Sequence, residues 1–186
     1  IIGLAFLGLL PHHSTAFEIS GLPFQLTADT IELDKKDGAI LASGNVRMNY
    51  KDYLIQADQF RYYNEEQILD YHSNITVTKN KNIIKTDHFR YNLQTSKGHA
   101  INVDSQFKSA HFFGETLDIS SDSSVFHKAK FTTCSQSEDN QYTVQSETIH
   151  YYSKSGNVIS NNNQIFFLDV PIFYFPRFIY QIGGDS

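Results

Sequence analysis

The 186-residue sequence contains no tryptophan, one methionine and a single cysteine. One cysteine cannot cross-link the chain to itself or build a multi-cysteine metal site. Basic side chains are also scarce, since 15 Lys and Arg stand against 20 Asp and Glu for a formal net charge of −5. That balance excludes a general nucleic-acid binder, whose phosphate contacts need a basic face. The apolar run over residues 1–10 is too short to span a bilayer as a helix.

Aromatic and aliphatic residues, in contrast, are abundant. The chain has 15 Phe and 11 Tyr, and its 40% of hydrophobic residues is enough to form a core. A chain of this length forms one domain, with or without appendages. The bias toward Phe, Tyr, Thr, Ile and Val is typical of strands, and no window shows a sustained helical stripe of apolar residues. The composition therefore predicts an all-β domain.

The N-terminal segment resembles the end of a secretory signal peptide. The apolar run Ile1–Leu10 is followed by the small residues Ser14 and Ala16, at the −3 and −1 positions of a cleavage site. We therefore expect residues 1–16 to be a signal-peptide remnant and residues 17–25 to be a linker. The alternative is that the apolar run forms a first buried strand or helix of the fold.

An acidic residue followed by apolar residues at its second and fourth positions recurs at a nearly fixed interval. The five copies begin at Asp29, Asp58, Asp87, Glu115 and Glu147, with spacings of 29, 29, 28 and 32 residues. A second half-motif follows each acid by 15 or 16 residues. Its copies are Asn45-Val46, Asn74-Ile75, Asn102-Val103, a degraded Lys130-Phe131, and Asn163-Gln164-Ile165. Self-similarity at such a period is the mark of a repeated supersecondary unit.

Each half-motif alternates between apolar and polar residues with period two, as strands do. Turn-forming residues separate the halves, so one repeat of about 29 residues predicts two strands and two turns. Five repeats predict about ten short strands in two facing antiparallel sheets, as a β-sandwich, a jellyroll or a short solenoid. The pattern does not distinguish a dry core from a lipid-lined slot.

Catalytic and metal-binding signatures are absent from the sequence. None of the eight histidines forms a His-Glu-x-x-His motif or combines with cysteine at zinc spacing. The repeated acids could suggest a glycosidase or lyase, but glycoside hydrolysis needs two carboxylates in unlike roles at one bond, and these acids are equivalent, so we interpret them as a strand-entry feature. His88 and His150 alternate with the apolar face and are expected to point to solvent. The sequence thus predicts a non-enzymatic protein with no catalytic residue, cofactor or metal.

Two stretches carry a resemblance to a known family. The repeats from Leu26 to Val103, with their Gly-Asn-Val and Ser-Asn-Ile sequences, resemble the OstA-like β-jellyroll of lipopolysaccharide-transport proteins. In the C-terminal third, Phe131-Thr-Thr-Cys134 and Val170-Pro-Ile-Phe-Tyr-Phe-Pro176 resemble the junction between jellyroll and barrel in the LptD family of LPS-assembly proteins.

The resemblance implies a domain organisation and a cargo. It implies an OstA-like jellyroll over residues 26–170 and a junction over residues 171–186 that leads toward a missing outer-membrane β-barrel. The expected function is lipopolysaccharide (LPS) transport and assembly at the periplasmic face of the Gram-negative outer membrane, with acyl chains held in an apolar groove. The residues expected to face inward and bind lipid are Ile31, Leu33, Val46, Met48, Phe60, Tyr62, Ile75, Val77, Phe89, Tyr91, Val103, Leu117, Ile119, Ile149, Tyr151, Ile165 and Phe167.

The resemblance also implies partners. The first strand, near residues 26–33, is expected to pair with a periplasmic bridge protein of LptA type by β-strand augmentation. A plug lipoprotein of LptE type is expected to bind through the missing barrel. The last strand, near residues 165–178, would lead into that barrel, or alternatively end the domain as a simple loop. Cys134 is expected to form a disulfide with the barrel, the alternative being a free thiol.

Two other interpretations remain open at this point. A standalone periplasmic bridge protein of LptA or LptC type would share the fold and the groove. A β-solenoid adhesin or polysaccharide-processing enzyme would instead be built from right-handed parallel coils, with an acidic cleft facing solvent.

Overall fold

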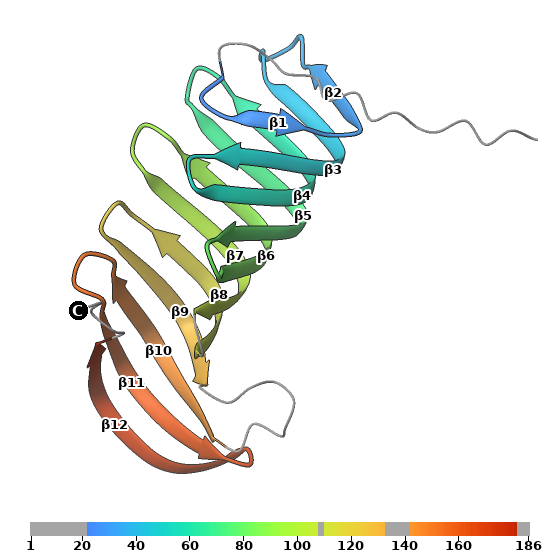
Figure 1. The fold of residues 1–186 in the computed structure, drawn as a ribbon. Helices are drawn as coiled ribbons and strands as arrows, with labels where there is room; N and C mark the ends of the chain where they lie inside the picture. The colour runs from blue at the N-terminus through green and yellow to red at the C-terminus, as the bar shows by residue number, and fades with distance from the viewer. Residues whose placement is uncertain (1–21, 108–109, 133–141, 182–186) are drawn as a thin grey trace, which may run out of the picture.

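The computed structural model describes residues 22–107, 110–132 and 142–181. These residues form strands and turns with no helix, which confirms the predicted all-β class (Figure 1). Within the same ranges, no helix capable of crossing a membrane was found. The strands are β1 (Gln25–Thr27), β2 (Thr30–Leu33), β3 (Ile40–Tyr50), β4 (Tyr53–Tyr63), β5 (Ile68–Lys79), β6 (Asn82–Asn92), β7 (Lys97–Phe107), β8 (Ala110–Ile119), β9 (Ser123–Thr132), β10 (Tyr142–Tyr152), β11 (Asn157–Phe167) and β12 (Val170–Gln181).

The strands pair in chain order. β1 and β2 both pair with β3, and each later strand pairs with the next as far as β12. Figure 1 shows the result as an elongated, curved stack with β1 and β2 at one end and β12 at the other. The pairings are antiparallel throughout, unlike the parallel coils of a solenoid. The sheet extends to Gln181, past the jellyroll range predicted from the sequence.

The strands are longer than the sequence pattern predicted, because each contains a bend in place of a chain break. From β3 to β12 they are 10–12 residues long. The pairing register between β3 and β4 shifts between Ser43 and Val46, and similar shifts occur between β4 and β5 and between β5 and β6. Such bulges bend a strand and increase its twist. Residues with left-handed backbone near the middles of their strands include Asn45, Asn74, Asn102, Lys128 and Asn162.

The bends fold one hydrogen-bonded sheet into two facing halves. Tyr71, before the bend of β5, donates a hydrogen bond of 2.7 Å to the Sδ atom of Met48, after the bend of β3. Phe126, before the bend of β9, lies in one half, and Phe112, before the bend of β8, lies in the other. Their rings stack across the interior at 5.7 Å between centroids. The predicted arrangement of two facing antiparallel sheets is therefore confirmed, although continuous strands connect the two halves.

The repeated acids and the repeated asparagines meet at these bends. The side-chain amide of each asparagine donates to a repeated acid, which lies on the neighbouring strand or, for Asp29, in the bend between β1 and β2. The pairs are Asn45 with Asp29 (2.8 Å), Asn74 with Asp58 (2.5 Å), Asn102 with Asp87 (2.8 Å) and Asn162 with Glu147. In the remaining repeat, the Lys128 ammonium pairs with Glu115 at 2.7 Å. We call these pairs the corner clamps.

The corner clamps correct two sequence interpretations. The acids are not a general strand-entry feature, because four of the five lie inside strands, as Asp58 does in the middle of β4, and only Asp29 directly precedes a strand. The fourth and fifth half-motifs are also displaced, since Lys128 and Asn162 occupy the corners in place of Lys130 and Asn163. Asparagine suits the corner because it tolerates the left-handed backbone and its amide reaches the acid.

Replacing Asn74 separates the two contributions of a corner clamp, the hydrogen bond to the acid and the tolerance of asparagine for the left-handed backbone. Asn74→Ala removes the hydrogen bond to Asp58 and places an ordinary side chain at φ 51°, so we expect it to lower the free energy of unfolding by about 1–2 kcal/mol. Asn74→Gly removes the same hydrogen bond, but glycine adopts a positive φ without strain. We therefore expect Asn74→Gly to lower the free energy of unfolding less than Asn74→Ala does. Urea unfolding measures both variants. Equal stabilities for the wild type and Asn74→Ala would contradict this role.

Candidate functional site

The inner face of the first half carries one continuous row of mostly apolar residues. Cross-strand partners follow one another from β3 to β12 without interruption. The row is Ala42, Phe60, Tyr71, Phe89, Ala100, Leu117, Phe126, Ile149, Ser160 and Phe178. All of its members up to Ser160 are buried. Burial also raises the pKa of the Tyr71 phenol well above its usual value.

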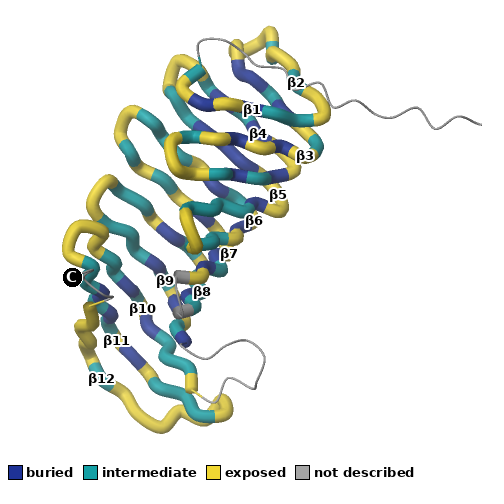
Figure 2. The backbone as a smooth tube through the Cα atoms, viewed as in Figure 1, coloured by how far each residue is buried: buried dark blue, intermediate teal, exposed yellow. Residues whose placement is uncertain are grey.

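The second half carries a matching row that faces the first. It begins at β1 and also reaches β12. The row is Leu26, Met48, Ile55, Val77, Ile84, Ser105, Phe112, Phe131, Val144, Ile165 and Phe173. The two rows together form the apolar interior that runs the length of the stack, and Figure 2 shows buried positions recurring along it from β3 to β11.

The residues predicted to bind lipid all fall in strands that border this interior, but they differ in burial. The buried ones are Val46, Met48, Phe60, Tyr62, Ile75, Phe89, Val103, Leu117 and Ile149. The half-buried ones are Ile31, Val77, Tyr91, Ile119, Tyr151, Ile165 and Phe167. Leu33, at the end of edge strand β2, is 66% exposed. Contacts such as Tyr71–Met48 join the two halves, so the middle of the interior is packed in this conformation.

The C-terminal end of the interior is open, and sequence reasoning missed the residues that line it. On β12, Phe173, Phe175, Phe178 and Tyr180 contact one another in succession, with ring centroids 5.8–6.5 Å apart. We call these residues the β12 aromatic row. Phe178 is 49% exposed and Tyr180 52% exposed, and Figure 2 shows β12 exposed along most of its length. The row continues both inner faces, since Phe178 pairs with Ser160 and Phe173 with Ile165.

The N-terminal end is closed in comparison. Phe24 is 7% exposed and packs edge-on against Phe60 and Tyr62, at 6.0 and 5.0 Å between ring centroids. Because Phe24 belongs to the core, the segment expected to be a linker contributes to the fold at its last residues. The outer backbone edges of β1 and β2 have no strand partner among the described residues.

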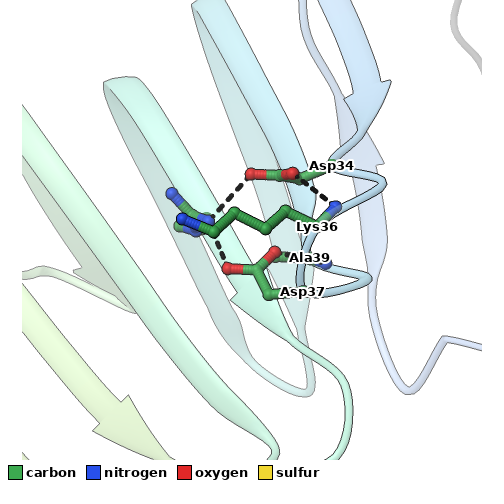
Figure 3. Close-up of polar contacts among 5 residues, drawn as sticks. Asp34, Lys36, Asp37 and Ala39 are labelled. Carbon is green, nitrogen blue, oxygen red and sulfur yellow. Dashed lines mark hydrogen bonds and ion pairs between the residues drawn. The ribbon is translucent and has the colours of Figure 1, made fainter.

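The loop before β3 is fixed by an ion-pair network on the outer face. Arg61 of β4 contacts Asp34 at 3.0 Å and Asp37 at 2.5 Å. Figure 3 shows both carboxylates turned to the same side, each also accepting a backbone N–H of the loop, from Lys36 and Ala39 respectively. The Ala39 N–H and the Arg61 guanidinium lower the pKa of the Asp37 carboxyl. The network ties the loop between β2 and β3 to β4.

Histidines also gather on the outer face. His88 faces outward, as expected, but it is held by an acid and is not free in solvent, because its Nε2 lies 2.7 Å from Asp70 Oδ1 and its side chain is 29% exposed. On β8, Asp118 lies between His99 (2.7 Å) and His127 (3.0 Å). Hydrogen bonds from these two rings, His99 first, lower the pKa of the Asp118 carboxyl. Cys134 lies outside the described residues.

A bent antiparallel sheet whose two apolar inner faces enclose a lengthwise interior is a β-jellyroll. The chain is similar in sequence to LPS-assembly protein LptD of two Nitrosomonas species. LptD of Nitrosomonas europaea is 26% identical over 192 residues, covering all of this chain and 26% of that protein. LptD of Nitrosomonas eutropha is 28% identical over 154 residues, covering 78% of this chain and 21% of that protein. The resemblance predicted from the sequence is thereby confirmed.

The chain spans about a quarter of the length of the curated relatives it matches. No protein-family model matches it. Among solved structures, LptH of Pseudomonas aeruginosa, described as the LptA-homologous periplasmic component of the lipopolysaccharide transport device, aligns with a TM-score of 0.46 and 16% identity. That alignment covers 52% of this chain and 74% of LptH.

Proposed function

We propose that this chain is a lipopolysaccharide-transport module that holds acyl chains between its two apolar inner faces and passes them along the stack. The observation that carries the proposal is the unbroken pair of inner rows, which ends on the exposed β12 aromatic row. The resemblance to LptD supports lipopolysaccharide as the cargo. On this proposal the module is not an enzyme, and it works at the periplasmic side of the outer membrane.

The energetics of the cargo explain why a continuous apolar path is needed. Each CH₂ group moved from water to an apolar site contributes about 0.8 kcal/mol. An acyl chain that left the path during transfer would lose several kcal/mol, whereas one sliding along facing apolar rows keeps its burial. The polar headgroup stays outside, because a buried charge without a partner is strongly unfavourable.

Lipid binding on this proposal requires the two halves to separate. The Tyr71–Met48 and Phe112–Phe126 contacts now join them, and an acyl chain lying along the interior replaces these contacts. The β12 end needs no such opening, because Phe178 and Tyr180 are already half exposed. We therefore infer that the lipid path is continuously accessible at β12 and opens transiently toward β3.

The edges support the expected partners. Among the described residues the outer edges of β1 and β2 have no strand partner, and the Arg61 network holds the loop after β2 against β4. We propose that a bridge protein of LptA type pairs here, so that two apolar interiors join end to end. The plug lipoprotein and the disulfide of Cys134 stay predictions from the resemblance.

Photo-crosslinking from neighbouring residues on opposite faces tests the lipid path. A photoreactive residue at Phe89 or Phe178 faces the interior, whereas one at Arg90 or Ile179 faces outward on the same strand. We expect lipopolysaccharide to crosslink from Phe89 and Phe178 and not from their controls. Phe178 and Ile179 are matched in exposure, at 49% and 61%, so accessibility alone cannot produce that difference. Crosslinking mainly from Arg90 and Ile179 would refute the inner path.

A further inference from the structure

We propose that Asp70, His72 and His88 form a binding site for a divalent transition-metal ion, best suited to zinc, on the outer face of the sheet. The three residues come from two adjacent strands, β5 and β6. One ligand atom from each, a carboxylate oxygen and two imidazole nitrogens, all lie within 4.8 Å of one another. Among the described residues, no other trio of His, Cys, Asp or Glu meets this condition. This inference does not depend on the transport proposal.

The sheet itself brings the three ligands together. Asp70 and His72 are two residues apart on β5, so their side chains leave the same face. His88 is the direct cross-strand partner of His72, and the two rings stack at 4.5 Å between centroids. Both Nε2 atoms approach Asp70 Oδ1, at 2.7 Å from His88 and 3.3 Å from His72. The convergence of three ligand atoms therefore rests on strand register, not on a flexible loop.

Burial and chemistry fit a metal ion better than a solvated ion pair. Asp70 is 6% exposed, whereas most aspartates lie at the surface. Two imidazoles and one carboxylate are ligands that zinc accepts, and three protein ligands leave a position for water. Ligands of a tetrahedral zinc with bonds of about 2.0 Å lie about 3.3 Å apart, and the separations from Asp70 Oδ1 to the two imidazole nitrogens are 2.7 and 3.3 Å. Arg90 contacts the other carboxylate oxygen, Oδ2, at 3.7 Å, which leaves Oδ1 for the metal.

The position gives the ion a mechanical role. Tyr71 lies between Asp70 and His72 in β5 and points to the opposite, inner face, where it is fully buried against Phe60 and Phe89. A metal ion that links β5 to β6 therefore clamps the sheet directly behind this aromatic contact. A metal ion that binds the folded chain and not the unfolded chain raises the thermal stability of the protein.

Zinc titration of the metal-free full chain tests the site. We expect calorimetry to show zinc binding, and zinc to raise the melting temperature. His72→Asn removes one ligand at a side chain that is 50% exposed, so we expect the variant to fold. Because loss of even an outer-shell partner typically weakens metal binding about 10–100-fold, we expect its zinc affinity to fall about tenfold or more. His88→Asn is expected to have the same effect.

His99→Asn is the matched control. His99 also contacts an aspartate on the outer face and is 46% exposed, but it lies outside the trio. We expect the His99→Asn variant to bind zinc with the same affinity as the wild type. Absence of zinc binding, unchanged affinity in His72→Asn, or an equal loss in His99→Asn would overturn the proposal.

Discussion

Replacing Tyr71 by alanine is expected to lower the free energy of unfolding by about 3–5 kcal/mol, a range typical of large aromatic deletions in a core. Tyr71 has no exposed surface. Its ring packs between Phe60 and Phe89, at 4.8 and 5.9 Å between centroids, and its hydroxyl reaches Met48 across the interior. The deletion thus opens a cavity where the two halves meet. Urea unfolding measures the loss.

Tyr71→Phe is the control for this prediction. It keeps the ring and removes only the hydroxyl contact with Met48, so we expect a loss of about 0.5–1.5 kcal/mol. A loss below about 1 kcal/mol for Tyr71→Ala would show that the halves are not packed through this residue, and that the interior stands open without lipid.

Period-two alternation was sufficient to predict the inner face. A strand exposes alternate residues to one side, and antiparallel pairing keeps each inward residue opposite another inward residue. Phe60 and Phe89, chosen from separate copies of the motif, therefore fall in one row with Tyr71 between them. Tyr71 was missed because it belongs to the part of β5 that precedes the second half-motif, and the anchor residues of the motif do not cover it.

The bends could not be predicted from alternation, because a bulge changes the spacing of inward residues. In β4 the inward residues Ala57 and Phe60 are three apart, so the period-two pattern breaks where the strand continues. For this reason the break in the alternation was interpreted as a boundary between two strands. The pairing of Lys128 with Glu115 depends on the register of β8 and β9, which the repeat spacing does not specify.

Two other features have no periodic signal at all. Residues 170–181 are apolar on both sides of β12, so alternation does not show which of them continue the interior. His72 and His88 lie far apart in the sequence and meet only because the two-residue turn at Asn80 and Lys81 sets the register of β5 against β6. Contacts between side chains on different strands can be predicted only when the register of those strands is known.

Acyl-chain contact at the β12 aromatic row is the second large effect that we expect. The chain has no tryptophan, so a single introduced tryptophan reports its own surroundings without background. Phe178→Trp places the indole on the inner side of β12, and Ile179→Trp places it on the outer side of the same strand. Both positions are exposed, so neither substitution disturbs the core.

The most direct measurement is the fluorescence of these two variants titrated with lipid A that carries brominated acyl chains, which quench only a nearby indole. The transport proposal predicts a blue shift and loss of most of the emission for Phe178→Trp, with little change for Ile179→Trp. Equal quenching of both variants, or quenching of Ile179→Trp alone, would contradict the claim that the two inner faces hold the acyl chains.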